Sequence, residues 1–192
     1  MNRFREAHNK RMQPDLIRDL LAYAKLNSDW NPKAVDLNEV TYEAGKAVSA
    51  LFPKAKVIAN DLPQVEGDPQ QLRLLFDNLI GNGVKFNRSE VPTVTIAAEE
   101  SDGAWHLNFA DNCLGLDPTF RDRVFEIFTR LHERSEFAGT GVGLAICRRV
   151  LELHGGKIEV TATSPEGTTF TCTLPKLNAA IGADYAPRTA TG

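Results

Sequence analysis

The sequence predicts an α+β protein in which helices pack on a mostly antiparallel sheet, as a two-layer α/β sandwich with an N-terminal amphipathic helix. Helical and strand-like patterns follow one another along the 192 residues without an internal repeat. Two pairs of strand-like runs are each joined by a short turn, which predicts antiparallel hairpins. A chain of this length forms one main hydrophobic core rather than two full domains.

The chain opens with a charged segment that carries one apolar stripe. Between residues 4 and 27, apolar residues recur at three- and four-residue spacing, among them Leu16, Leu20 and Ala24. This spacing predicts an amphipathic helix whose apolar side needs a partner. The following NSDWNPKA ends the helix and is interpreted as a linker.

Two capped helices and two strands are predicted next. Asp36, followed three residues later by Glu39, resembles a capping box that opens a second helix ending near LFPK. KVIAN and the stretch around Val65 are strand candidates. Asp68 is the predicted N-cap of a third helix, with Pro69 at its first position.

The second half of the chain predicts two hairpins and two helices. TVTIAAEE and WHLNFAD, separated by SDG, form the first hairpin, and KIEVTAT and TTFTCTL form the second around SPEG. Between them, RDRVFEIF predicts a short helix, TRLHERSEFAG a polar connection, and LAICRRVLELHGG an amphipathic helix stopped by two glycines. The tail from residue 178 is small and polar, which predicts disorder.

The composition favours a soluble protein of the cytoplasm. A net charge of −3 gives no reason to expect nucleic acid or an anionic membrane as partner. Cys113, Cys147 and Cys172 are odd in number and lack the paired spacing of a zinc site, which favours a reducing compartment. No signal peptide and no run of about 18 apolar residues is present, so we expect no direct membrane insertion, although the chain could be a piece of a longer, membrane-attached protein.

The first polar cluster is DNLIGNGVKF, at the end of the third predicted helix. Asn78 and Asn82 are four residues apart, and Lys85 follows three residues later on the same side. Amide oxygens suit Mg²⁺ and a lysine suits phosphate, so this edge could hold a metal ion and the phosphates that it bridges. A solvated helix face is the alternative.

The second cluster is DNCLGLD, directly after a predicted strand. Asp111 at the strand's end, followed by Gly115 in a tight turn, could accept a hydrogen bond from an amino group such as that of adenine. An Asx-type turn is the alternative.

The third and fourth clusters are RVFEIFTRLHER and GTGVGLAI. Phe125 and Phe128 could anchor a charged connection that ends at glycine hinges, as in a mobile lid. Arg130, His132 and Arg134 could reach a nucleotide from this lid. An exposed loop and a structural turn before a helix are the alternatives.

Taken together, these four stretches resemble the ATP-binding catalytic domain of sensor histidine kinases, in the GHKL superfamily shared with gyrase and the heat-shock chaperones. DNLIGNGVKF is similar to the family's N box, DNCLGLD to its first glycine box, VFEIF to its F box and GTGVGLAI to its second glycine box. FTRLHERSEFAGTGVGLAICRRVLELHGG is most similar to the phytochrome-like group. The resemblance covers residues 36–176 and implies the Bergerat ATP-binding fold.

The resemblance implies an ATP-dependent protein-histidine kinase with Mg²⁺ as cofactor. Asn82 would coordinate the metal, Asn78 and Lys85 would be the catalytic residues of the phosphate channel, and Asp111 would bind the adenine amino group. The implied nucleotide-binding residues are Asn78, Asn82, Lys85, Asp111, Gly115, Arg130, His132, Gly139, Thr140, Gly141, Val142, Gly143, Leu144 and Thr169. Members that hydrolyse ATP carry a glutamate at the site of Asn78, and an amide cannot take a proton from water at neutral pH, so we expect little hydrolysis.

Two residues depart from the family pattern. Cys113 stands where glycine is usual, and Gly83 stands where alanine is usual. A side chain at Cys113 would be strained if its φ were positive, and glycine inside a helix costs up to about 1 kcal/mol relative to alanine. We therefore expect both departures to act on nucleotide affinity rather than on the fold.

The resemblance also divides the chain. Residues 1–30 resemble the second helix of the family's dimerisation and phosphoacceptor hairpin, residues 31–177 the ATP-binding domain, and residues 178–192 form the disordered tail. The hairpin's first helix, which carries the phosphorylated histidine, is absent, and His8 is interpreted as a solvated helix residue. The implied partners are a histidine-bearing helix, a response regulator and a second copy bound through residues 4–27.

Three functions are compatible with the sequence. The first is transfer of the γ-phosphoryl group of Mg-ATP to a histidine on a separate chain or missing segment. The second is a catalytically silent nucleotide-binding module that docks on a kinase hairpin or response regulator. The third is a serine kinase of the anti-sigma type, which ranks last because those proteins keep an acidic residue where Asn78 stands.

Overall fold

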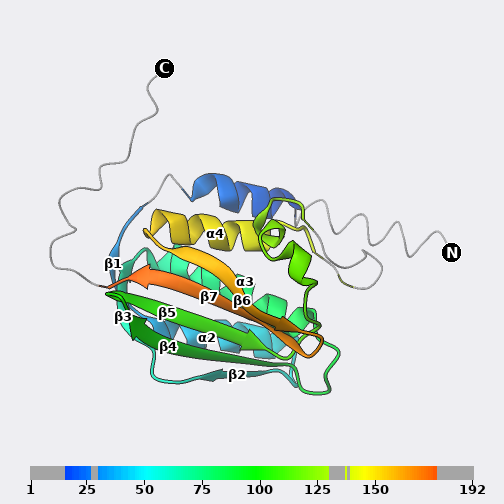
Figure 1. The fold of residues 1–192 in the computed structure, drawn as a ribbon. Coiled ribbons are helices and arrows are strands. Elements are labelled where there is room, and N and C mark those ends of the chain that lie inside the picture. Colours follow the sequence, from blue (N-terminus) through cyan, green and yellow to red (C-terminus); the bar gives the residue numbers. More distant parts are fainter. Residues whose placement is uncertain (1–15, 27–29, 130–136, 138, 177–192) are drawn as a thin grey trace.

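The protein is a two-layer α+β sandwich, which confirms the predicted fold class. The computed structural model describes residues 16–26, 30–129, 137 and 139–176 (Figure 1). A five-stranded sheet forms one layer, and the three main helices lie together on one of its faces (Figure 1). In the described part of the chain, no helix has the length and apolar character needed to cross a bilayer.

The main sheet has one parallel pair and three antiparallel pairs. Its strands, in spatial order, are β2 (Lys56–Ala59), β4 (Thr93–Ser101), β5 (Ala104–Asp111), β7 (Gly167–Pro175) and β6 (Lys157–Ser164). Strands β2 and β4 are parallel, and the other neighbours are antiparallel. Both predicted hairpins, β4–β5 and β6–β7, are confirmed. At the β4–β5 turn, Asp102 and Gly103 have φ of 53° and 75°, as a two-residue hairpin turn requires.

A second, two-stranded sheet was not predicted. It pairs β1 (Lys33–Asp36) antiparallel with β3 (Gln64–Gly67), so that Val35 lies opposite Val65. The linker prediction for NSDWNPKA is therefore wrong for its last two residues, which belong to β1. Because the partner strand lies about thirty residues further along the chain, no local pattern marks this pairing.

Two of the three main helices begin at the predicted caps. The three are α2 (Leu37–Leu51), α3 (Pro69–Lys85) and α4 (Gly143–Leu153). The Asp36 side chain accepts a hydrogen bond from the Asn38 backbone N–H at the start of α2. The Asp68 side chain caps α3 by accepting from the N–H groups of Gln70 and Gln71.

Within RDRVFEIF, the predicted helix is reduced to one short 3-10 turn, η2 (Arg123–Phe125), and a second such turn, η1 (Pro118–Phe120), lies just before this stretch. A longer helix is interrupted because Glu126 is extended, with a ψ of 141°, and Phe128 then has a φ of 70°, outside the helical region. The Phe128 N–H donates instead to the carbonyl oxygen of Gly141 at 2.8 Å. This bond ties the segment after η2 to the glycine-rich loop before α4.

The described part of the predicted N-terminal helix covers residues 16–25, and residues 1–15 lie outside the description. Leu26, at its end, is buried, and its carbonyl oxygen accepts from the Gln71 side-chain amide at 3.0 Å. Ile17 and Leu21 remain 58% and 55% exposed. The helix therefore rests partly on the domain itself and leaves apolar side chains uncovered. The predicted disordered tail, residues 178–192, is also outside the description.

Helix α3 is the central helix, and it carries the polar edge formed by Asn78, Asn82 and Lys85. It packs against the sheet, where Phe76 meets Phe109 edge to face with 5.0 Å between ring centroids. Its core residues are no more than 3% exposed; they are Leu72, Leu75, Phe76, Leu79 and Ile80. With one side fixed in the core, the side that carries Asn78, Asn82 and Lys85 is held in a defined place.

Candidate functional site

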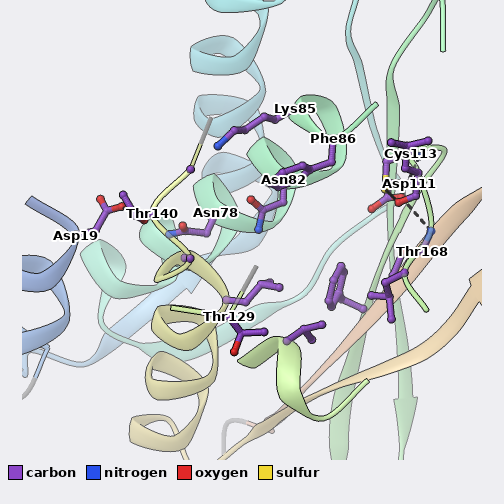
Figure 2. Close-up of a pocket in the computed structure, with 18 of the residues that line it drawn as sticks. Asp19, Asn78, Asn82, Lys85, Phe86, Asp111, Cys113, Thr129, Thr140 and Thr168 are labelled. Atoms are coloured by element: carbon purple, nitrogen blue, oxygen red, sulfur yellow. Dashed lines mark hydrogen bonds between the residues drawn. The ribbon is translucent and has the colours of Figure 1, made fainter. Parts of the chain in front are cut away.

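A cavity of about 280 Å³ lies between α3, the end of β5 and the loop that leads into α4 (Figure 2). Its size is near the lower end of the range for small-molecule sites. Nine of the predicted site residues line it: Asn78, Asn82, Lys85, Asp111, Gly139, Thr140, Gly141, Gly143 and Leu144. Three segments that are far apart in sequence therefore meet at one cavity.

The polar edge of α3 forms one wall. Asn78, Asn82 and Lys85 all line the cavity, as their spacing predicts. The Asn78 side-chain amide donates to the carbonyl oxygen of Leu74 at 2.8 Å, which fixes its orientation. The Lys85 ammonium lies 5.1 Å from the centre of the Phe86 ring. This wall presents amide groups and one positive charge to a ligand.

Asp111, the last residue of β5, lies at one end of the cavity. Its Oδ1 accepts hydrogen bonds from the backbone N–H groups of Cys113, at 3.1 Å, and Thr168, at 3.0 Å (Figure 2). Burial raises the pKa of this carboxyl, while the hydrogen bonds from Cys113 and Thr168 lower it. A carboxylate has more acceptor sites than these two bonds use, so it can also accept from a ligand N–H.

The glycine-rich loop forms the opposite wall. Gly141 has a φ of 75°, which a residue with a side chain rarely adopts. A Cβ at Gly143 would lie 2.6 Å from Asn78 Oδ1, so a side chain here would displace the Asn78 amide from the cavity wall. The first backbone N–H groups of α4 lie beside the cavity, where a helix N-terminus favours an anion.

The N-terminal helix reaches this loop. The Thr140 hydroxyl donates to Asp19 Oδ2 at 2.6 Å, and Arg18 and Asp19 both line the cavity. Figure 2 shows Asp19 and Thr140 at one end of the cavity, and Asp111 with Thr168 at the other. The two residues that form this bond are 121 positions apart, so the sequence carries no signal for it.

Three predicted residues do not line the cavity. A Cβ at Gly115 would lie 1.7 Å from the carbonyl oxygen of Ser164, so Gly115 allows the chain to pack on the β6–β7 hairpin. Val142 is fully buried. Thr169 pairs with Ala110 and Ala162 in the sheet, while its neighbour Thr168 lines the cavity. Arg130, His132 and Arg134 lie outside the described residues.

Sequence reasoning missed much of the rest of the lining. The additional residues are Arg18, Asp19, Phe86, Cys113, Leu114, Leu116, Val124, Thr129, Thr168 and Phe170. Several are apolar neighbours of the predicted motifs, and proximity to those motifs is the signal that could have found them. For Thr168, the strand is predicted but the residue chosen from it is off by one position.

Cys113 is accommodated without backbone strain. Among the described residues other than glycine, only Asp102 and Phe128 have a positive φ. The condition for strain at Cys113 is therefore not met. Its thiol is buried, donates to the Leu114 carbonyl oxygen at 3.0 Å, and has its pKa raised by burial and by the nearby Asp111 charge.

A metal ion in this cavity would rely on amide oxygens and on the ligand. Within the described ranges, no group of three or more His, Cys, Asp or Glu residues could hold a metal. Mg²⁺ commonly takes one or two protein oxygens together with waters and substrate phosphates. The Asn82 side chain in the cavity wall is compatible with that kind of site.

Sequence comparison finds one matching protein family and similar proteins from bacteria. Residues 67–178 match the family described as histidine kinase-, DNA gyrase B-, and HSP90-like ATPase. The chain is 42% identical over 165 residues to cyanobacterial phytochrome A of Nostoc sp., covering 83% of this chain and 21% of that protein. It is 33% identical over 187 residues to the phosphate regulon sensor protein PhoR of Pseudomonas aeruginosa, covering 93% of this chain and 42% of that protein. The chain thus spans less than half of either relative.

Structure comparison finds the same fold in solved kinases. The mycobacterial sensor histidine kinase MprB has a TM-score of 0.66 at 28% identity, covering 77% of this chain and 97% of that one. Full-length ShkA in complex with AMPPNP has a TM-score of 0.71 at 27% identity, covering 84% of this chain and 35% of that one. The second structure holds an ATP analogue.

Proposed function

The chain belongs to the histidine kinase-, DNA gyrase B-, and HSP90-like ATPase family, and from this premise we propose that it is the catalytic domain of a two-component sensor histidine kinase. It binds Mg-ATP and transfers the γ-phosphoryl group to a histidine on another chain or segment. One observation carries the proposal: three distant segments, each similar to a family box, converge on a single cavity. We place its action in the cytoplasm.

The base would be recognised at the Asp111 end of the cavity. The carboxylate is half-buried and held by two backbone N–H groups, so it is already oriented before a ligand arrives. It would accept a hydrogen bond from the exocyclic amino group of adenine. A buried acceptor of this kind discriminates strongly against a base that lacks the donor, because it would be left unpaired.

The phosphates would lie between the α3 edge and the glycine-rich loop. Lys85 supplies positive charge, and the start of α4 supplies backbone N–H groups. Asn82 would hold Mg²⁺, which neutralises developing charge on the β- and γ-phosphates. In the transfer, an imidazole nitrogen forms a bond to the γ-phosphorus while the bond to the β–γ bridging oxygen breaks and ADP leaves.

The side chain of Asn78 supports transfer over hydrolysis. It lies in the cavity wall, and its amide is oriented by the Leu74 carbonyl oxygen at 2.8 Å. An amide has no basic site that could take a proton from an attacking water at neutral pH. The acidic residues among the described lining residues are Asp111, at the base end, and Asp19, which accepts from Thr140. Catalysis would rest on positioning and charge stabilisation.

The proposed organisation follows from the same family. Residues 1–30 would be the second helix of a dimerisation hairpin, residues 31–177 the ATP-binding domain, and residues 178–192 a tail. Ile17, Leu20 and Leu21 are exposed on the described part of the helix, which supports a second copy bound through residues 4–27. A histidine-bearing helix and a response regulator would be the other partners.

Phosphotransfer in trans tests this proposal. The chain is mixed with Mg-ATP labelled on the γ-phosphate and with the helical hairpin of a related sensor kinase as acceptor. We expect label on the hairpin that is lost in acid and retained in base, as for phosphohistidine, and less label with Asn82→Ala. Acid-stable label would support a serine kinase instead. Nucleotide binding without any transfer would support the silent regulatory module.

A further inference from the structure

Gly83 lies inside α3 and directly faces Asp111. A Cβ at this position would lie 2.8 Å from Asp111 Cβ, 2.8 Å from Val94 Cγ2 and 3.2 Å from Asp111 Oδ2. Neither close neighbour is the end of a flexible side chain, because Asp111 Cβ is fixed to β5 and Val94 is 1% exposed on β4. A methyl group here would therefore displace the carboxylate or its strand. This contact explains a glycine in the last turn of α3.

Cys113 holds the same carboxylate through its other oxygen. The Cys113 N–H donates to Asp111 Oδ1 at 3.1 Å, while its thiol donates to the Leu114 carbonyl oxygen at 3.0 Å. Thr168 N–H completes the set at 3.0 Å. Cys113 is only 9% exposed, so its side chain fills space beside the carboxylate. Oδ1 is thus fixed by Cys113 and Thr168, while Oδ2 lies against Gly83.

From these contacts we infer that Gly83 and Cys113 act as a coupled pair of positioning residues, which together set the place of the Asp111 carboxylate and so the recognition of the base. The inference rests on the proposed function and deepens it at the base end. Cys113 occupies space on one side, and the missing side chain at Gly83 leaves room on the other. A methyl group at position 83 would displace the carboxylate from the place in which Cys113 and Thr168 hold it.

A double-mutant cycle tests the coupling. Gly83→Ala, Cys113→Gly and the double variant are compared with the parent chain for binding of ATP and of inosine triphosphate, whose base carries an oxygen in place of the amino group. Gly83→Ala weakens ATP binding by about tenfold, because a hydrogen bond to a charged group is lost, and changes inosine triphosphate binding by less than about twofold. The double variant recovers part of the lost ATP affinity, because Cys113→Gly leaves room for the carboxylate to move while the contact with Val94 Cγ2 remains.

A matched control is available in the same helix. A Cβ added at Gly81 meets no atom within 4 Å, so Gly81→Ala adds the same methyl group to α3 without a clash. This variant keeps the affinity for both nucleotides. A general disturbance of α3 would lower the affinities for ATP and for inosine triphosphate alike. A displaced Asp111 carboxylate would instead change the ratio of these two affinities.

Three results would overturn the inference. They are unchanged ATP affinity in Gly83→Ala, equal losses for the two nucleotides, and purely additive effects in the double variant. If Gly83→Ala does not fold, Cys113→Ala provides the test, because a smaller side chain leaves space beside the carboxylate and lowers the preference for ATP over inosine triphosphate by about threefold; an unchanged preference contradicts the coupling. Absence of nucleotide binding in every variant would contradict the proposed function as well.

Discussion

The two ends of the cavity are built in different ways. The base end is made from regular elements of the core: Asp111 ends β5, Thr168 lies in β7, and Gly83 lies within α3. The phosphate end combines the α3 edge with a loop and with a helix remote in sequence, which meet through the hydrogen bond between Thr140 and Asp19. A site can thus have one end fixed by the fold and another that depends on contacts between separate segments.

This difference has a consequence for binding. The base end carries its ligand-reading group already oriented by two backbone N–H donors, so little ordering remains to be done when a ligand arrives. At the phosphate end, the Thr140 hydroxyl already donates a hydrogen bond to the negatively charged Asp19. We expect substitutions at the base end to change which base is bound, and substitutions at the phosphate end to change the response to Mg²⁺ and to salt.

The largest effect is expected at Asp111. Asp111→Asn keeps an oxygen that can accept from Cys113 and Thr168 but turns a donor toward the adenine amino group, so ATP affinity falls by about a hundredfold. Because burial raises the pKa of Asp111, its ionised form costs stability at neutral pH, and the variant should unfold at the same or a higher temperature. Calorimetric titration with ATP and thermal unfolding measure the two effects. An unchanged ATP affinity would remove Asp111 from base recognition.

Asn82 is expected to have the next largest effect. Asn82→Ala removes the amide oxygen proposed to hold Mg²⁺, so ATP binding in the presence of Mg²⁺ weakens by about tenfold. Binding in the presence of a chelator stays the same in both proteins. Titrations with and without Mg²⁺ therefore separate this end from the base end, since Asp111→Asn lowers the affinity in both conditions. Equal losses with Mg²⁺ and with chelator would contradict a role in metal binding.

A smaller effect, of opposite sign, is expected at Asp19. Asp19→Asn removes a negative charge beside the phosphate end, so ATP affinity rises by about threefold at low salt, and the gain shrinks at high salt. Adenosine, which has no phosphates, binds equally to both proteins. Asp61→Asn is the matched control, because it makes the same charge change at an exposed residue outside the cavity lining. A gain that also appears with adenosine would point to a change of shape rather than of charge.

The smallest effect on binding is expected at His154, which lies away from both ends. Its Nε2 accepts from the Asp68 N–H at 3.1 Å and its Nδ1 lies 2.7 Å from the Val150 carbonyl oxygen, so the neutral ring joins α4 to the start of α3. Burial lowers the pKa of His154, opposed by the Val150 hydrogen bond and the Asp68 charge. Below about pH 6.5, the unfolded chain therefore binds more protons than the folded chain. The free energy of unfolding then decreases as the pH falls toward the lower pKa that His154 has in the folded protein.

Denaturant unfolding between pH 7.5 and 5 checks this expectation. The parent chain should lose stability over that range, and His154→Gln should lose less, with ATP affinity at pH 7.5 within about twofold of the parent. Parallel pH curves for the two proteins would show that another group is responsible. A large loss of ATP affinity would instead link this junction to the cavity.

The elements with local signals were predictable from the sequence. Asp36 and Asp68 mark helix starts because their side chains cap neighbouring N–H groups, and the SDG turn marks a hairpin because its geometry is set within two residues. The spacing of Asn78 and Asn82 also predicted that they lie on one side of a helix, because residues four apart share a helix face. A residue pattern within one short segment was enough in each case.

Features that depend on distant contacts were not predictable. Strand β1 forms only because β3 lies beside it, and Phe128 leaves the helical region where its N–H reaches Gly141. The approach of Asp19 to Thr140 spans 121 residues. Gly83 read as a costly helix residue, and only the position of Asp111 supplies the reason for it.

Equilibrium binding of a fluorescent ATP analogue tests whether the cavity binds ATP and whether Asp111 reads its base. It is measured with and without Mg²⁺ and in competition with unlabelled ATP and inosine triphosphate. We expect saturable binding that Mg²⁺ strengthens, that ATP displaces readily and that inosine triphosphate displaces poorly. Absence of binding at millimolar nucleotide, or displacement by the two triphosphates with equal ease, would contradict an ATP site whose base is read by Asp111.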